Sequence, residues 1–316
     1  MNQKVSLQIN LAPGDFPHVQ HLLPHQLNRL QAQVNEIILT VDTQPGNGRF
    51  ADGWFKHESS LKHWLETVIE PNYPVKIVPV NYTPAVKQEV ARYFFNKDNI
   101  PVKDFRGGPF YAYFFGLHTA ANDLVFHLDS DIFLGGGSPQ WVEEAVKYLK
   151  DDLSCFVMAP LPGPPRDDDT LVDQRIIEKI APFTWQLEGM STRIFLMDRS
   201  KFKAHKLELD KPSLRMQLKA IIEQHDIAEL PERLIANYIK SHNLKRIDFL
   251  GTAKGMWSLH PPYRTASFYK QLPEIIRQVE ANNLPLRQRG FYDLIDEVCD
   301  WTEAREKIKQ NRWWRR

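Results

Sequence analysis

Apolar residues along the first part of the chain alternate between two periods. Residues 5–11 alternate apolar and polar side chains, as a strand does, whereas residues 22–34 repeat apolar side chains three or four apart, as a helix does. Residues 36–41 return to a strand-like run, so the chain begins with a β-α-β unit. The same alternation continues in helix 60–69, strand 75–80, a helix that begins at Pro84 after the N-cap Thr83, helix 109–121 and strand 124–128. This pattern predicts an α/β fold, Rossmann-like, with a mostly parallel sheet and helices on both faces.

The pattern is less regular after residue 135. Residues 160–169 hold four prolines and three consecutive aspartates, which predicts a loop that acts as a linker or a lid. The remaining predicted elements are helix 139–149, strand 154–159, strand 193–197, helices 214–224 and 233–241, strand 247–250 and an amphipathic helix from about 293 to 310.

The composition is that of a globular chain and excludes several classes of protein. Of 316 residues, 42% are hydrophobic and 25% are charged, and the formal net charge of +1 offers no general attraction to a polyanion. We therefore expect no nucleic-acid partner. Cys155 and Cys299 are too few for a disulfide framework, and no apolar run reaches the roughly 20 residues of a membrane span. Together with an N-terminus that lacks the apolar core of a signal peptide, these features predict a cytoplasmic protein.

The C-terminal tail has two interpretations. Residues 313–316 read Trp-Trp-Arg-Arg, and aromatic and basic residues of this kind dock on anionic lipid. Peripheral membrane contact through the tail is one prediction, and a frayed terminus is the other.

Segment 122–137 carries the most informative pattern. Residues 124–128 are apolar without alternation, as in a central parallel strand, and they are followed by Asp129-Ser130-Asp131. Side chains two residues apart on an extended backbone point the same way, and ligands of open α/β sheets bind beyond the carboxyl ends of the strands. We therefore expect both carboxylates to be aimed at one spot, where Mg²⁺ or Mn²⁺ relieves their repulsion. The alternative is that the two aspartates only begin a turn.

Asp129-Ser130-Asp131 after a buried strand, preceded by the helix-start sequence Arg106-Gly107-Gly108-Pro109, resembles the Asp-X-Asp motif of GT-A type glycosyltransferases, in particular family 2. The resemblance implies the GT-A fold and Mn²⁺ or Mg²⁺ as cofactor. It also implies transfer of a sugar from a nucleotide-sugar, most simply a UDP- or GDP-sugar, to a hydroxyl group of a glycan, a lipid or a small molecule. The implied division is a GT-A domain at 1–290, with a nucleotide-binding half at about 1–135 and an acceptor-side half at about 136–290, and a C-terminal helix and tail at 291–316.

The resemblance also implies which residues hold the metal. Asp131 and His260 would bind the ion, while Asp129 would reach the ribose or share the ion. His260 follows strand 247–250 and a turn, where a purely structural histidine is the alternative. Imidazole suits Mn²⁺ less well than carboxylate does, although mixed ligand sets occur.

Three further residues match the donor-binding part of the resemblance. Asp42, at the end of strand 36–41, would contact the base or the ribose, unless it only caps a loop. Arg106 would add a cation near the phosphates. Gly189, in the sequence WQLEGMSTRIFLMDR, resembles the glycine of the acceptor segment, and we group it with the donor-binding residues; a plain loop glycine is the alternative.

The resemblance implies a general base at the start of a helix. Glu232 holds that place, but the chain reads Pro231-Glu232-Arg233 where the family commonly has Glu-Asp. An acidic residue in a first helical turn is also favoured by the helix dipole alone. Glu188 is the rival base. A single displacement inverts the anomeric centre, so we expect an inverting enzyme.

Missing motifs limit the alternatives. The chain has no Gly-X-Gly-X-X-Gly after the first strand, no Gly-Lys-Ser/Thr loop and no Gly-X-Ser-X-Gly elbow. Two other functions stay open: a nucleotidyltransferase, although residues 11–16 lack its Gly-rich basic loop, and a nucleotide-sugar-binding module without turnover, which Pro231 at the base motif permits. His18, His21 and His25 are not expected to bind metal, because Pro24 should interrupt a helix there.

Overall fold

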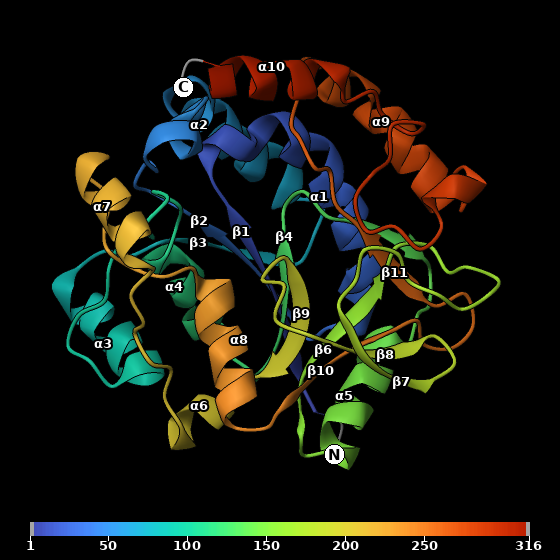
Figure 1. Ribbon diagram of the computed structural model, residues 1–316, viewed down its shortest axis with the longest axis horizontal. Helices are drawn as coiled ribbons and strands as arrows, with labels where there is room; N and C mark the ends of the chain where they lie inside the picture. The colour runs from blue at the N-terminus through green and yellow to red at the C-terminus, as the bar shows by residue number, and fades with distance from the viewer. Residues whose placement is uncertain (1–2, 314–316) are drawn as a thin grey trace.

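A central mixed sheet organises the protein (Figure 1). The computed structural model describes residues 3–313, apart from the side chains of residue 49 and residues 311–313. The strand order is β3-β2-β1-β4-β9-β6-β10-β8-β7. The strands are β1 (Val5–Leu11), β2 (Glu36–Val41), β3 (Val75–Pro79), β4 (Leu124–Asp129), β6 (Cys155–Pro162), β7 (Ile176–Ala181), β8 (Thr184–Leu187), β9 (Ile194–Asp198) and β10 (Lys245–Phe249). Strands β3, β2, β1 and β4 are parallel neighbours, β9 runs antiparallel between β4 and β6, and β10 is parallel to β6.

Helices cover both faces of this sheet, as the sequence predicts. The helices are α1 (Phe16–Leu30), α2 (Trp54–Trp64), α3 (Pro84–Phe95), α4 (Tyr111–Thr119), α5 (Trp141–Asp151), α6 (Lys201–Ala204), α7 (Leu214–Ile222), α8 (Pro231–Ser241), α9 (Ala266–Glu280) and α10 (Thr302–Trp313). Leu7 and Ile9 pack with α1, α2 and α5 on one face. Ile38 and Val125 pack with α3, α4 and α8 on the other. The α/β class with a largely parallel sheet is therefore confirmed.

A short second ladder joins two distant parts of the chain. Strand β5 (Phe133–Gly136) pairs antiparallel with β11 (Met256–Leu259), and β11 pairs in parallel with the end of β6. Gly135 lies opposite Trp257, and a Cβ atom at this glycine would lie 2.0 Å from the indole ring. The absence of a side chain at Gly135 therefore allows the indole to close over β5.

Helix α1 corrects one expectation. It spans Phe16–Leu30 and contains Pro24, so this proline does not interrupt the helix. A proline inside a helix costs about 3 kcal/mol, because it removes a hydrogen bond and crowds the preceding turn. Burial of Val19, Leu23 and Leu27 against the sheet offsets that cost.

The C-terminal third departs further from the prediction. Helix α9 and the β7–β8 hairpin were not predicted. Helix α10 begins at Thr302 and not near residue 293, because residues 293–301 form turns that bury Leu294 and Trp301. Strand β6 continues to Pro162, so the proline-rich loop is shorter than expected.

Among the described helices, none is both long and apolar enough to cross a membrane. Residues 314–316 and the side chain of Trp313 lie outside the described part of the chain, so lipid contact through the tail stays a prediction, as does the cytoplasmic location. Cys155 and Cys299 are both buried free thiols.

Candidate functional site

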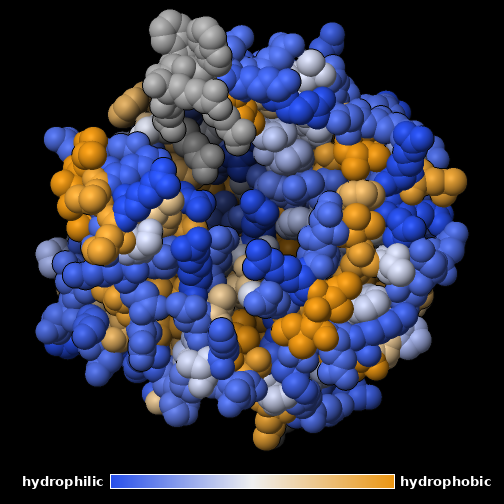
Figure 2. Space-filling model, viewed as in Figure 1, coloured by the Kyte–Doolittle hydropathy of each residue, from blue (hydrophilic) through white to orange (hydrophobic). Residues whose placement is uncertain are grey.

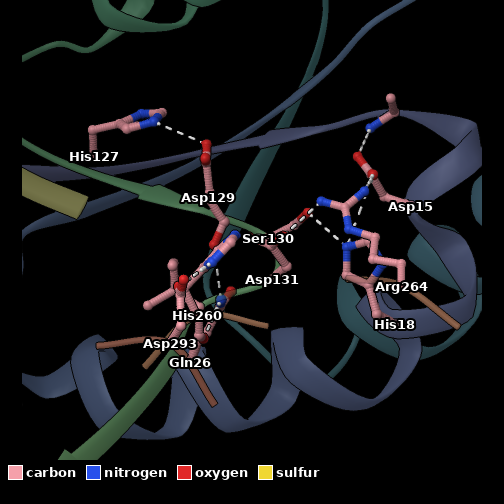
Figure 3. Close-up of polar contacts among 12 residues, drawn as sticks. Asp15, His18, Gln26, His127, Asp129, Ser130, Asp131, His260, Arg264 and Asp293 are labelled. Carbon is pink, nitrogen blue, oxygen red and sulfur yellow. Dashed lines mark hydrogen bonds and ion pairs between the residues drawn. The ribbon is translucent and has the colours of Figure 1, made fainter. Parts of the chain in front are cut away.

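The two aspartates at the end of β4 contact different partners (Figure 3). Asp129 ends the strand, and its Oδ1 lies 3.3 Å from Nε2 of His127, two residues earlier on the same face. Ser130 and Asp131 form a turn in which the N–H of Ile132 donates to the carbonyl of Asp129 at 3.3 Å. The backbone is no longer extended at Asp131, so the period-two rule does not apply there. The two carboxylates therefore have different hydrogen-bond partners, while both raise the pKa of Arg193 through their charge. That they share a metal ion stays a prediction.

Arg264 pairs with the carboxylate of Asp131. Its Nη2 lies 2.7 Å from Oδ2 of Asp131, and its Nη1 lies 3.0 Å from Oδ1 of Asp15. Burial works to raise the pKa of Asp131, but Arg264, followed by His260 and His18, holds that pKa well below its ordinary value. Burial works to lower the pKa of Arg264, but the charges of Asp131 and Asp15 outweigh burial and raise that pKa above its ordinary value. Both groups are therefore ionised at neutral pH.

The β5–β11 ladder brings His260 to Asp131. Leu259 pairs with Phe133, so the residues just before β5 and just after β11 meet. Nε2 of His260 lies 3.8 Å from Oδ2 of Asp131, and Nδ1 of His260 lies 2.9 Å from Oδ1 of Asp293. One short antiparallel ladder thus brings together Asp131 and His260, which are more than a hundred residues apart in the sequence.

Asp131 and His260 form a corner whose chemistry fits a divalent cation. Metal-binding histidines commonly donate their second ring N–H to a carboxylate, which is the relation of His260 to Asp293. Within residues 3–313 no three His, Cys, Asp or Glu side chains converge on one point, so an ion here needs further oxygen atoms. Mg²⁺ and Mn²⁺ usually take such atoms from water and phosphates. Arg264 now contacts Asp131 Oδ2 and would have to move.

A cavity of about 370 Å³, called here the larger cavity, opens beyond the carboxyl ends of β1, β2 and β4. This is the place where open α/β sheets bind ligands. Predicted residues in its wall are Asp42, Arg106, Asp129 and Glu232, and further charged residues there include Asp15, Lys103, Arg193 and Arg264. Figure 2 shows hydrophilic residues around a hollow near the middle of this face. Asp131 and His260 are not in the wall, whereas Arg264, which contacts Asp131, is.

Asp42 both faces the larger cavity and caps a loop. Its Oδ1 accepts hydrogen bonds from Tyr82 Oη at 2.5 Å and from the N–H of Gln44 at 3.1 Å. Nζ of Lys103 lies 3.4 Å from its Oδ2. Burial, and then the charge of Asp42, raise the pKa of Tyr82, so the phenol remains a donor. The two interpretations of Asp42 are therefore compatible.

Two guanidinium groups in the wall of the larger cavity are available to a ligand. Arg106 is exposed, with its guanidinium 5.3 Å from the centre of the Phe105 ring, and Arg193 is exposed at the start of β9. Neither guanidinium makes a hydrogen bond or close ion pair with another described residue. A guanidinium binds phosphate oxygens in pairs, so both side chains suit a diphosphate.

Glu232 stands where the larger cavity meets a second one. It lies in the first turn of α8, after Pro231, and it lines the larger cavity and a neighbouring cavity of about 200 Å³, called here the smaller cavity. Its carboxylate has no hydrogen bond or ion pair with the residues that the structure describes. Arg193 also lines both cavities. A carboxylate without a partner at such a junction can accept a proton from a bound molecule.

Glu188 and Gly189 lie apart from both cavities. Glu188 is 63% exposed, and its Oε2 lies 3.9 Å from Nη1 of Arg175. Gly189 has a φ of +79°, in the left-handed region that favours glycine, and the space around its missing Cβ is open. Their neighbours Met190 and Ser191 do line the smaller cavity.

Several residues of the site were missed by sequence analysis, namely Asp15, Lys103, Tyr113, Arg193 and Arg264. Asp15 could have been found, because it follows β1 and the carboxyl ends of neighbouring parallel strands meet at one edge of a sheet. Tyr113 lies in the aromatic helix α4, and its buried hydroxyl has no hydrogen-bond partner among the described residues, a feature that no sequence pattern reveals. Arg264 follows a Pro-Pro turn, and no local pattern connects it to Asp131.

Comparisons with known proteins give partial similarities. No protein-family model and no curated protein matches the chain. Among solved structures, UDP-glucose pyrophosphorylase complexed with UDP-glucose is similar over 87% of this chain and 99% of its own, at 9% identity and a TM-score of 0.46. The Pyrobaculum calidifontis mannosyltransferase PcManGT, in complex with GDP-Man and Mn²⁺, is similar over 88% of this chain and 63% of its own, at 10% identity and a TM-score of 0.40.

S. aureus TarS 1–349 is similar over 81% of this chain, at 10% identity and a TM-score of 0.36. The match covers 60% of the TarS structure. The similar structures thus include glycosyltransferases, as the sequence resemblance predicts, and nucleotidyltransferases, its stated alternative.

Proposed function

We propose that this protein is a metal-dependent glycosyltransferase that moves a sugar from a UDP- or GDP-sugar to a hydroxyl group, with inversion. One observation carries the proposal: Glu232 and Arg193 both stand at the junction of the two cavities, and neither side chain makes a hydrogen bond or close ion pair with a described residue. A carboxylate and a guanidinium shared by two adjoining cavities support a reaction between two bound molecules. A module that only binds a nucleotide-sugar needs one cavity.

The larger cavity is proposed to bind the nucleotide-sugar. Asp42, which follows β2, and Lys103, which pairs with it from the segment before α4, offer an acceptor and a donor to the nucleoside. Asp129, whose side chain is 38% exposed, offers acceptors to ribose hydroxyls. Arg106 and Arg193 are then the cations for the diphosphate. Residues 1–135 supply most of this cavity, in keeping with the proposed nucleotide-binding half.

Glu232 is proposed to act as the general base. It takes the proton of the acceptor hydroxyl while that oxygen forms a bond to the anomeric carbon of the sugar. The bond from this carbon to the diphosphate oxygen breaks, and its electron pair leaves with the nucleoside diphosphate. The products are the glycoside, the nucleoside diphosphate and a proton on Glu232. One displacement of this kind inverts the anomeric centre.

Asp131 and His260 are the residues proposed to hold Mn²⁺ or Mg²⁺. Such an ion, when bound, stabilises negative charge on a leaving diphosphate as a Lewis acid. Asp293 orients the imidazole of His260 by accepting its Nδ1–H. Arg264 lines the larger cavity and supplies a further positive charge there. We assign the loop of Gly189 to the acceptor side of a transferase domain proposed at 1–290, and the position of Met190 and Ser191 in the wall of the smaller cavity supports this assignment.

The test is a transfer assay with the full chain, Mn²⁺, and UDP-glucose, UDP-galactose, UDP-GlcNAc or GDP-mannose, against a panel of glycosides. The expected result is release of UDP or GDP together with a product heavier by one sugar, measured by mass spectrometry. Release of pyrophosphate from a nucleoside triphosphate and a sugar phosphate would favour a nucleotidyltransferase. Tight binding of nucleotide-sugars with no release of nucleoside diphosphate to any acceptor would favour a binding module. Either result contradicts the proposal.

A further inference from the structure

Two residues in the wall of the smaller cavity carry buried hydroxyl groups that have no hydrogen-bond partner among the described residues. Oγ of Ser258, on β11, and Oη of Tyr292 are both buried, and neither has a hydrogen-bond partner among the described residues. Both residues line the smaller cavity, and Ser258 is only 1% exposed. A buried polar group without a partner is unfavourable, so a ligand hydroxyl that reaches these two groups gains affinity from them.

Packing fixes the position of the Tyr292 hydroxyl. The ring of Tyr292 stacks on His260, with centroids 5.9 Å apart and planes inclined by 13°. Leu259 ends β11 directly after Ser258, and His260 is the next residue. The Ser258 hydroxyl is therefore two residues from the imidazole on which the Tyr292 ring stacks. Ser258 and Tyr292 therefore belong to the same wall of the smaller cavity.

The charged groups of the smaller cavity balance one another. Nε and Nη2 of Arg246 donate to the two oxygens of Asp248 at 2.7 and 2.6 Å, which uses the planar donor fork of this arginine. Asp248 is 1% exposed and its charge is neutralised by Arg246, so neither group is available to bind a charged ligand. The other two charged groups are Arg193 and Glu232, of opposite sign, at the border with the larger cavity. A cavity of this kind favours a neutral ligand over an anionic one.

The size and the remaining walls narrow the class of ligand. A volume of about 200 Å³ corresponds to roughly seven water molecules, which suits one sugar ring. Pro160, Pro162 and Ile194 add apolar surface for the C–H groups of such a ring, and Gln174 adds an amide. A long acyl chain would instead need a continuous apolar groove.

We propose that the smaller cavity is a subsite for one neutral sugar ring of the acceptor. Ser258 Oγ, Tyr292 Oη and the amide of Gln174 hold the hydroxyl groups of the ring, and the hydroxyl group to be glycosylated faces Glu232. This inference rests on the proposed transferase function, and it adds the chemical class of the acceptor and the residues that select it.

The test is binding of methyl glycosides of glucose, galactose and mannose to the full chain, with and without UDP and Mn²⁺, measured by ligand-observed NMR titration. Glucose 6-phosphate and glucuronate are the charged comparisons. We expect at least one neutral glycoside to bind and the charged sugars to bind more weakly. Ser258→Ala and Tyr292→Phe are each expected to weaken glycoside binding about tenfold, the effect of one hydrogen bond of about 1.4 kcal/mol.

Thermal unfolding separates a binding role from a structural one. Neither hydroxyl has a partner in the described structure, so both variants should keep the unfolding temperature of the wild type. Ser6→Ala is the matched control, because Ser6 is a buried serine whose hydroxyl donates to Glu36 at 2.6 Å, at the opposite end of β1. This control should lower the unfolding temperature and leave glycoside binding unchanged.

The proposal is overturned when no neutral glycoside binds, when the charged sugars bind more tightly, or when both variants bind glycosides like the wild type. If one variant does not fold, the other decides. A separate measurement of UDP-sugar binding to the wild type and to Asp42→Asn tests the proposed donor site. It therefore distinguishes failure of the subsite proposal from failure of the proposed transferase function. Nucleotide-sugar binding without glycoside binding removes the subsite alone, whereas glycoside binding without nucleotide-sugar binding supports the subsite and contradicts the transferase.

Discussion

Arg264 Nη2 lies 2.7 Å from Oδ2 of Asp131, the carboxylate that the family resemblance predicts to bind a metal ion. The same guanidinium reaches Asp15, so it ties the end of β4 to the start of α1. An organic cation therefore neutralises Asp131 in the structure. A divalent ion bound at this oxygen would compete with Arg264 and would release the guanidinium.

Replacement of Arg264 by Gln is expected to strengthen the response to Mn²⁺ in the absence of nucleotide, because it removes the competing cation. A ligand that binds only the folded state raises the unfolding temperature, so Mn²⁺ should raise that temperature more in the variant than in the wild type. The measurement is thermal unfolding at neutral pH, with and without Mn²⁺, supported by calorimetric titration. Arg277→Gln is the control, since Arg277 is 74% exposed on α9 and pairs with Glu274. Equal responses of wild type and Arg264→Gln would show that there is no competition.

Glu232→Gln is expected to lower kcat by about 10²- to 10⁴-fold, the usual contribution of a general base. Nucleotide-sugar binding should persist, because the amide is close in shape to the carboxylate. Glu188→Gln, at an exposed position in the wall of neither cavity, should keep wild-type kinetics. Steady-state kinetics and donor binding of both variants check this pair. A loss of kcat in Glu188→Gln alone would reverse the assignment of the base.

The buried imidazole of His18 should make stability depend on pH. Burial, helped by the charge of Arg264 and opposed by that of Asp131, lowers the pKa of His18 from 6.5 to about 3. Between these values the unfolded chain binds a proton that the folded chain does not, so the free energy of unfolding falls as the pH falls from about 6.5 towards 3. Within that interval, each unit by which the pH falls lowers the free energy of unfolding by about 1.4 kcal/mol at most.

His18→Gln is expected to make the free energy of unfolding less dependent on pH between about 6 and 4, as measured by urea denaturation at several pH values. The comparison uses slopes, because the loss of the 3.1 Å contact between His18 Nε2 and Ser130 Oγ also lowers stability at neutral pH. His63→Gln, on the exposed side of α2, is the control. The same slope in wild type and His18→Gln would contradict the prediction.

Gly135→Ala should destabilise the β5–β11 ladder, because the added Cβ would lie 2.0 Å from the ring of Trp257. We expect a loss of about 1–3 kcal/mol, the usual cost of overpacking, and a weaker Mn²⁺ response, since this ladder holds Asp131 beside His260. Urea denaturation and Mn²⁺ titration measure the two effects. Wild-type stability in Gly135→Ala would mean that the indole can move away without cost.

The alternation of apolar residues was enough to predict much of the N-terminal half. Val5–Leu11 is a strand that its alternation reveals, and Glu36–Val41 and Leu124–Asp129 are strands that short β-rich runs reveal. The same reasoning failed at Pro24, where tertiary burial outweighs a local helix-breaking preference. It also failed at α9, whose apolar face becomes evident only against β5 and α1.

By itself, the sequence determined the α/β class, the position of Asp129 and Asp42 at strand ends, and the place of Glu232 at a helix start, because these depend on neighbours along the chain. Only the tertiary structure decided that Asp131 meets His260 and Arg264, that Glu232 and Arg193 share two cavities, and that Glu188 lies apart from them. These relations join residues that are far apart in the chain. Strand pairing and packing bring them together, and no local period encodes such contacts.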